Sequence, residues 1–232
     1  MIGIIGGAGV AATNKLCELI EIKLTQKGAF RDVHHPEMII YQATQAPSRA
    51  MYLEGRGESF IEDFITIGRK MKMAGATILC MCCNTAHYAI DEIQSLVGLP
   101  FINVVEEVIF EIREKNIKKV GLIATDGCLK GEVYEKYFKK HIPDVQIIYP
   151  NSEQQREVTT GICNVKNKNR FLEEHHPERP KNIFTRVYDH LIEKGADSVI
   201  IGCTDIRVDF EHPQVIDSLE ILANTILKIT NT

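Results

Sequence analysis

Short apolar runs recur along this chain, and each one stops at a turn of small or polar residues. Four of them are rich in Ile, Val or Leu and are typical of buried parallel strands: 1–5, 77–81, 119–124 and 197–201. Three shorter runs add candidate strands at 37–42, 101–103 and 146–149. Between the runs, apolar residues recur with helical spacing at 14–25, 59–73, 86–97, 132–140 and 183–194. Strand and helix alternate throughout, which predicts an α/β fold with parallel sheets.

The same pattern occurs twice at a nearly constant offset. Ile123 follows Ile5 by 118 residues, and Cys203 follows Cys83 by 120 residues. In each half an early strand opens into a small-residue loop, GGAGVAAT or ATDGCLKG, and a later strand ends in a cysteine closely followed by threonine. An unrelated α/β chain can also recur on this scale, but the shared details favour an internal duplication.

A duplication of this kind predicts two similar Rossmann-like domains with parallel sheets, related by a pseudo-twofold axis. We expect the active site in the cleft between them. The first domain is assigned to residues 1–104 together with 213–232, because the helix expected at 218–229 returns to pack on it. The second domain is assigned to residues 105–212.

Charge and cysteine content exclude several classes of protein. The formal net charge is -4 and no basic stripe with interleaved aromatic residues is present, so no nucleic-acid partner is expected. Neither a signal peptide nor a membrane span is recognisable, so no membrane partner is expected. Seven cysteines without disulfide-framework spacing indicate reduced thiols and a cytoplasmic protein. The segment HHPE, at 34–37 and 175–178, is interpreted as a solvated loop, and no metal site is expected.

Two cysteines stand where ligands bind in folds of this class. In an open α/β sheet ligands collect outside the carboxyl ends of the strands, and Cys83 and Cys203 are both predicted to lie there. Asn84 and Thr85 carry side chains that commonly cap a helix start. The free N–H groups of a helix start lower the pKa of a thiol and can hold a carboxylate. Thr204 repeats this arrangement beside Cys203, so each half offers a reactive sulfur next to an anion-binding turn.

The remaining cysteines lack this context, and we expect them to be packed or inert: Cys17, Cys80, Cys82, Cys128 and Cys163. A C-x-x-C redox pair over 80–83 is disfavoured, because its first cysteine would lie inside the strand. A zinc site would need a second ligand cluster. A hydrolase pair of Cys83 with His87 is disfavoured, because residues four apart on a helix rarely act together as nucleophile and base.

Three motifs, in their order and spacing, resemble the aspartate/glutamate racemase family and most closely its aspartate racemase branch: IGIIGGAG with AAT, CNTAH, and GCTDI. The resemblance extends over nearly the whole chain. It implies cofactor-independent racemisation, with Cys83 and Cys203 on opposite faces of the substrate Cα. One thiolate removes the α-proton and the other thiol protonates the far face, so the two sulfurs share one proton and titrate as a coupled pair. Family members are commonly dimers, so a homodimer is expected.

The resemblance also implies a small-molecule substrate, an acidic amino acid. QAPSRA matches the family loop that carries an arginine, which assigns Arg49, and GICNVKNKN matches the segment that carries a lysine, which assigns Lys166, with Lys168 as the alternative. Together they would hold the distal carboxylate of Asp, or of Glu, with Arg49 able to bind it in a bidentate manner. The candidates for contacts to the α-carboxylate and ammonium are Asn84, Thr85, Thr125 and Thr204.

Four positions depart from the family pattern. Ala8 stands where the first loop commonly has Met, and Cys82 where Pro usually precedes the first cysteine. Asp205 stands where Glu commonly follows the second Cys-Thr, and Arg207 comes two residues later. Ala8 could open the pocket and Arg207 at its rim could alter selectivity. Two alternatives therefore stay open: a related enzyme (hydantoin racemase, maleate isomerase or decarboxylase) and a non-catalytic amino-acid-binding protein.

Overall fold

The computed structural model describes residues 1–230 and contains two parallel sheets of four strands each. The first sheet has the order β2-β1-β3-β4, with β1 (Ile2–Gly6), β2 (Met38–Gln42), β3 (Ile78–Met81) and β4 (Phe101–Ile102). The second has the order β6-β5-β7-β8, with β5 (Lys119–Ile123), β6 (Gln146–Ile148), β7 (Ser198–Ile201) and β8 (Val215–Asp217). The predicted α/β class with parallel sheets is confirmed.

The two sheets are equivalent in register as well as in order. In the first, Ile5 of β1 lies opposite Met81 of β3, and in the second, Ile123 of β5 lies opposite Ile201 of β7. The offset of about 120 residues in the sequence therefore corresponds to matched strand positions. Because all strands of a sheet run in parallel, the loops that follow β1 and β3 emerge at one edge, as do those that follow β5 and β7.

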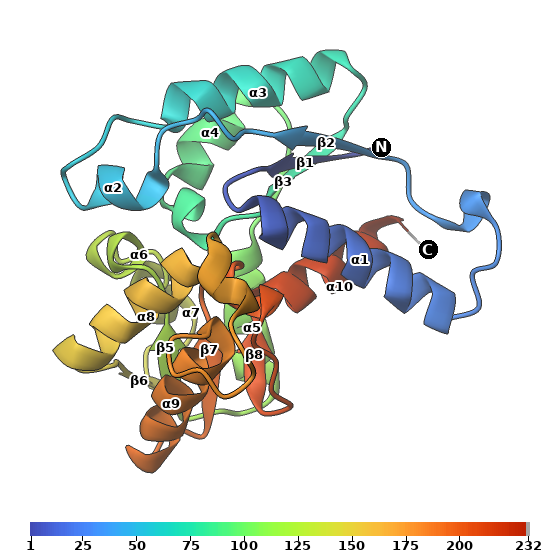
Figure 1. The fold of residues 1–232 in the computed structure, drawn as a ribbon. Helices are drawn as coiled ribbons and strands as arrows, with labels where there is room; N and C mark the ends of the chain where they lie inside the picture. The colour runs from blue at the N-terminus through green and yellow to red at the C-terminus, as the bar shows by residue number, and fades with distance from the viewer. Residues whose placement is uncertain (231–232) are drawn as a thin grey trace.

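Helices form an outer layer on each sheet and a shared layer between the sheets (Figure 1). The outer helices are α3 (Ile61–Met73) and α4 (Ile90–Val97) on the first sheet, and α8 (Ser152–Val165) and α9 (Pro180–Glu193) on the second. The shared layer consists of α1 (Val10–Gln26), α5 (Val104–Glu114), α7 (Glu135–His141) and α10 (Ser218–Thr230). Two short helices, α2 (Arg49–Leu53) and α6 (Asp126–Lys130), and four 3-10 segments, η1 (Asp32–His34), η2 (Asn84–Ala89), η3 (Lys168–Phe171) and η4 (Ile206–Val208), complete the fold.

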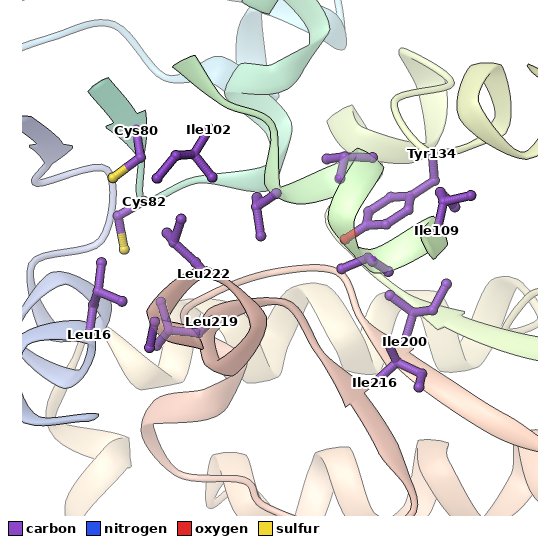
Figure 2. Packing of buried hydrophobic residues seen from close by; sticks show 14 of the residues in the cluster. Leu16, Cys80, Cys82, Ile102, Ile109, Tyr134, Ile200, Ile216, Leu219 and Leu222 are labelled. Carbon is purple, nitrogen blue, oxygen red and sulfur yellow. The ribbon is translucent and has the colours of Figure 1, made fainter. Parts of the chain in front are cut away.

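The largest apolar core fills the space between the two sheets. Leu16 of α1, Leu219 of α10 and Ile109 of α5 meet there with residues of both sheets (Figure 2). Cys80 and Cys82 point into this core and are completely buried, so their predicted packing role is confirmed. Since the core joins both halves, the loops at the sheet edges are held in a fixed relation to each other. Within residues 1–230, no helix is both long and apolar enough to cross a bilayer.

The terminal helices of the two halves cross over. Helix α5, which follows the first sheet, packs against α7 and β8 of the second half, and α10 packs against α1 of the first half. Strand β8 was not predicted, and it pairs with β7, so residues 215–217 belong to the second sheet although the range 213–232 was assigned to the first domain. Helices α5 and α8 were also not predicted. Strand β8 was missed because its apolar run consists of Val215 and Ile216 alone, between the polar residues Gln214 and Asp217.

The loop after β1 illustrates why the first motif is rich in glycine. Gly7 has a φ of 76°, a conformation that favours glycine, and a Cβ there would overlap the backbone of Ala43. Its N–H donates to the buried hydroxyl of Thr13 at 3.0 Å. Thr13 in turn donates to the carbonyl of Gly9, also at 3.0 Å, so the end of the GGAGVAAT motif closes the loop. This closure brings the start of α1 to the edge where the cysteine loops emerge.

Candidate active site

A small cavity of about 50 Å³, called the inner cavity below, lies between the two halves at the strand-end edges. Four of its twelve lining residues were not among the predicted site residues: Ala8, Ser48, Ala50 and Asp205. The other eight are all of the predicted ones: Arg49, Cys83, Asn84, Thr85, Thr125, Lys166, Cys203 and Thr204. The fold thus gathers on one cavity predicted site residues that are up to 155 positions apart, from Arg49 to Thr204.

Cys83 and Cys203 differ from the packed cysteines in their access to the cavity. Each is 9% exposed, whereas Cys80 and Cys82 are completely buried. Cys83 follows β3 and Cys203 follows β7, the matched strands of the two sheets, so the duplicated fold delivers one sulfur from each side. A ligand in the inner cavity would therefore meet one thiol from each half.

The surroundings of Cys203 favour its protonated form. Burial raises the pKa of this thiol to about 12, and the nearby carboxylate of Asp205 adds to the rise. The charge of Lys166 and a backbone N–H from Asp205 act in the opposite direction and lower the pKa. Lys166 and the backbone N–H of Asp205 would thus stabilise a thiolate at Cys203. While the cavity is empty, burial has the larger effect and the pKa of the thiol stays high.

The predicted capping role of Asn84 and Thr85 is wrong. Cys83 occupies the N-cap position of η2 and no side chain caps this start. The amide of Asn84 donates to Ser218 at 2.8 Å and accepts from the hydroxyl of Tyr134 at 2.9 Å. The hydroxyls of Thr85 and Thr125 lie 3.0 Å apart. Both side chains find their partners in the opposite half of the molecule, so they fix the Cys83 loop across the cleft and do not cap their own helix.

Threonines of the second half mirror this arrangement. The hydroxyl of Thr204 donates across the cleft to the carbonyl of Cys82 at 3.3 Å. Thr125 caps α6 by accepting the N–H of Cys128 at 3.1 Å, in addition to its contact with Thr85. The Cys83 loop is therefore hydrogen-bonded to the Cys203 loop through Thr204 and to the loop after β5 through Thr125.

His87 supports the Cys83 loop from beneath. Its ring is fully buried, and Nδ1 lies 2.9 Å from the carbonyl oxygen of Cys83. A carbonyl can only accept, so Nδ1 carries the proton and donates. Burial lowers the pKa of His87 to about 4, which keeps the ring neutral at physiological pH. The residue does not line the inner cavity, and its contact is with the backbone of Cys83 and not with the thiol.

Arg49 begins helix α2 and is held against the cavity wall by backbone carbonyls. Its guanidinium donates to the carbonyl of Pro47 at 2.9 Å and to that of Ala8 at 3.1 Å. Its Nε is buried and has no hydrogen-bond partner. No ion pair to an acid is found for Arg49 within the described part of the chain. Backbone carbonyls orient the cation, and its charge acts against the burial that raises the pKa of the nearby Asp205, without a direct ion pair among the described residues.

Lys166 forms an ion pair with Asp205, with 2.9 Å between Nζ and Oδ2. Burial is the largest single influence on Lys166 and lowers its pKa, but the charge and hydrogen bond of Asp205, together with the nearby Cys203 and Cys83, outweigh it, so the pKa of the lysine is raised. Lys168, the alternative at the sequence level, lines a separate outer cavity and not the inner one. Asp205 was not among the predicted site residues, although its place beside Thr204 already put an acid next to the second sulfur.

Arg207 does not reach the inner cavity, which corrects the expectation that it lies at the rim. It is buried beneath β8, where Nε lies 2.6 Å from Oδ2 of Asp217 and Nη1 lies 3.1 Å from Glu211. Burial raises the pKa of Asp217 to about 6, against the lowering effect of Arg207. A buried arginine requires a carboxylate partner, and β8 provides it on the side away from the cavity.

An outer cavity of about 970 Å³ adjoins the inner one. Ala8, Ser48, Arg49 and Lys166 line both, so they form the partition between the two spaces. Helix α2 covers the inner cavity by reaching from the first half to α6 of the second (Figure 1). A Cβ at Gly127 would lie 2.5 Å from the backbone of Ala50, so only glycine permits this approach.

Solved structures resemble this fold over its whole length. An aspartate racemase from Picrophilus torridus has a TM-score of 0.82 at 22% identity, covering 99% of this chain and 94% of that one. An aspartate racemase homologue from Pyrococcus horikoshii OT3 has a TM-score of 0.74 at 23% identity, covering 100% and 99%. These likenesses establish the shared two-sheet fold.

Sequence comparison gives a related result. The broad specificity amino-acid racemase RacX of Bacillus subtilis is 28% identical over 97% of this chain and 96% of its own length. Residues 5–226 match the Asp/Glu/hydantoin racemase family. The resemblance inferred from the three motifs is thereby confirmed, and the chain belongs to the Asp/Glu/hydantoin racemase family and is an enzyme of the racemase type.

Proposed function

We propose that this enzyme racemises an acidic amino acid, aspartate first, without an organic cofactor, using Cys83 and Cys203 as its two acid–base groups. The observation that carries the proposal is the pair of equally exposed thiols, one from each half, on a single closed cavity. Racemisation is symmetric: the reverse reaction needs the same two groups with their protons exchanged. Two matched cysteines on a duplicated fold meet that requirement.

The proposed step moves one proton on and one proton off the same carbon. A thiolate on one side takes the α-proton and becomes a thiol, which leaves a carbanion at Cα. The thiol on the other side protonates the opposite face and becomes a thiolate. The product has inverted configuration and the enzyme has exchanged the protonation of its two sulfurs. In the empty enzyme the surroundings of Cys203 favour its protonated form, so this sulfur begins as the thiol.

Substrate selection is assigned to the cations of the cavity wall. Arg49 has an oriented guanidinium with a free buried Nε, and Lys166 extends from the opposite half. The distal carboxylate of an acidic substrate would pair with these two groups through charge-assisted bonds. Neutral amino acids offer only one carboxylate, so we expect acidic substrates to be preferred.

Entry to the site requires movement of its cover. The inner cavity of about 50 Å³ holds at most a few water molecules and is too small for an amino acid. The outer cavity offers an approach past Ala8 and Arg49, and α2 is the short element that separates the two spaces. Displacement of α2 from Gly127 would widen the inner cavity, and its return would exclude water during proton transfer.

The test is proton NMR of L-Asp, L-Glu and a neutral amino acid in D2O with purified enzyme, without pyridoxal phosphate, followed by chiral analysis. We expect the α-proton signal of L-Asp to disappear while D-Asp accumulates. Cys163→Ser, which changes an exposed cysteine outside both cavities, is the matched control and should behave as the wild type. Absence of exchange with every amino acid, from folded protein with reduced thiols, would contradict the proposal.

A further inference from the structure

Asp205 carries a buried carboxylate oxygen that nothing in the empty site uses. The residue is 2% exposed, and its Oδ2 is paired with Nζ of Lys166 at 2.9 Å. Its Oδ1 is buried and has no hydrogen-bond partner among the described residues. An unsatisfied buried acceptor is unfavourable and uncommon in folded proteins, so a donor supplied by a ligand would explain its presence.

The duplicated half shows that the scaffold itself does not need an acid here. Cys-Asn-Thr at 83–85 corresponds to Cys-Thr-Asp at 203–205, so the position of Asp205 is occupied by Thr85 in the first half. Thr85 is satisfied by its contact with Thr125 across the cleft. The carboxylate of Asp205 therefore has a role that is specific to the second half of the site and that Thr85 does not have in the first half.

Asp205 is also held firmly in place. A Cβ on Gly9 would overlap Oδ1, so the carboxylate packs against the backbone of the first-half loop. Lys166 holds the other oxygen. The side chain is thus fixed between one element of each half, on the wall of the inner cavity and two residues from Cys203.

The charges on this wall match one class of molecule. Among the described residues that line the inner cavity, the ionisable side chains other than the two thiols are two basic ones, Arg49 and Lys166, and one acidic one, Asp205. An acidic amino acid at neutral pH carries two carboxylates and one ammonium, which is the complementary set. A dicarboxylate without an amine would leave the oxygen of Asp205 facing a like charge or an empty space.

We infer that Asp205 binds the α-ammonium of the substrate and thereby selects amino acids over dicarboxylates that lack an amine. The inference rests on the proposed function and extends it, because it assigns the ammonium contact to a single residue of the second half. Substrate ammonium would supply the missing donor to Oδ1. Lys166 would then be shared between Asp205 and a substrate carboxylate. Asp205 acts as a substrate-binding residue, and it takes no part in proton transfer at Cα.

The experiment measures the binding of L-aspartate and of succinate, which lacks the amine, by calorimetry on the wild type and on Asp205→Asn. On the wild type, L-aspartate should bind at least 10-fold more tightly than succinate. In Asp205→Asn the affinity for L-aspartate should fall at least 10-fold, while succinate should bind equally well or more tightly, since Lys166 is released from its partner. Asp205→Glu keeps the charge and should retain most of the preference for L-aspartate.

Asp209→Asn is the matched control, because Asp209 is also paired with a cation, that of Arg179, but lies outside both cavities. It should leave both affinities unchanged. Equal loss of affinity for L-aspartate and succinate in Asp205→Asn, or equal affinity of the wild type for both, would overturn the inference. The wild-type comparison decides the matter even if Asp205→Asn fails to fold. A wild type that binds L-aspartate without α-proton exchange would instead refute the proposed function alone.

Discussion

The two cysteine loops occupy matched positions but have different surroundings. After β3, Cys83 is followed by residues whose partners are neutral, Thr125, Ser218 and Tyr134. After β7, Cys203 is followed by Asp205, which forms an ion pair with Lys166. The first loop is thus fixed by a network of neutral hydrogen bonds, and the second by charge.

This difference separates two contributions to the site: the positions of the sulfurs, which the two halves share, and the charges around them, which differ between the halves. Duplication sets two sulfurs at equivalent strand ends on facing sides of one cavity. Divergence next to Cys203 changes the proton affinity of one sulfur and adds charged groups for a ligand. A racemase needs symmetry for its chemistry but has to hold a chiral substrate that is itself asymmetric. Four predictions test how much each half contributes to proton transfer, to substrate binding and to the stability of the site.

The largest effect is expected from removing either sulfur. Cys83→Ser and Cys203→Ser should each reduce racemisation by at least about 10³-fold, because a serine hydroxyl is a far weaker acid than a thiol and general acid–base catalysis is worth 10²–10⁴. Turnover of both enantiomers by polarimetry, with circular dichroism as a check on folding, measures this. Full activity in either variant would contradict the symmetric two-base scheme.

The next effect belongs to the first loop and concerns stability. His87 has a pKa of about 4 in the folded protein, against an ordinary value of 6.5. Between these values the unfolded chain binds the extra proton and the folded chain does not, so the free energy of unfolding falls as the pH falls. The loss by pH 4 is roughly 3 kcal/mol, at 1.36 kcal/mol per pH unit.

Urea unfolding of His87→Gln between pH 7 and pH 4 provides the measurement. This contribution should vanish from the pH dependence of the variant, while a substitution of the exposed His175 by Gln should leave it in place. The same pH dependence in His87→Gln as in the wild type would show that other groups cause the loss.

Removing the cation of the first half should affect substrates unequally. Arg49→Ala is expected to lower kcat/KM for aspartate about 100-fold, because a buried carboxylate loses its charged partner, and to change turnover of a neutral amino acid much less. Arg69→Ala is the matched control, since Arg69 also donates to a backbone carbonyl, that of Leu96, but lies outside both cavities. An equal loss of kcat/KM for acidic and neutral substrates would mean that Arg49 only holds the loop in place and does not bind the distal carboxylate.

The smallest effect tests the neutral network behind Cys83. Tyr134→Phe removes the hydroxyl that donates to Asn84 at 2.9 Å and leaves a buried amide oxygen without its donor. We expect the free energy of unfolding to fall by about 1–2 kcal/mol. Tyr149→Phe, which changes a solvent-exposed hydroxyl, should stay within about 0.5 kcal/mol of the wild type in the same urea titration. Equal changes in the two variants would mean that the network adds nothing.

The sequence predicted the repeated elements well and the short or isolated ones poorly. The ends of β1, β3, β5 and β7 were predicted to within one or two residues, because apolar runs between small-residue turns are strong local signals. Strand β8 was missed because only two apolar residues, Val215 and Ile216, mark it in the sequence. The caps assigned to Asn84 and Thr85 were wrong for another reason: a local preference gave way to partners in the opposite half.

Motif spacing by itself predicted the class of fold, the repeated sheet pattern and the positions of Cys83 and Cys203 after matched strands, because each depends on residue types at regular intervals along one chain. Only the tertiary structure decided which charges reach the cavity. It placed Lys166 inside and Lys168 outside, turned Arg207 away towards Asp217, and set Asp205 against Gly9. The reason is physical: burial and ion pairing depend on contacts between segments that are distant in sequence, and no local pattern records those contacts.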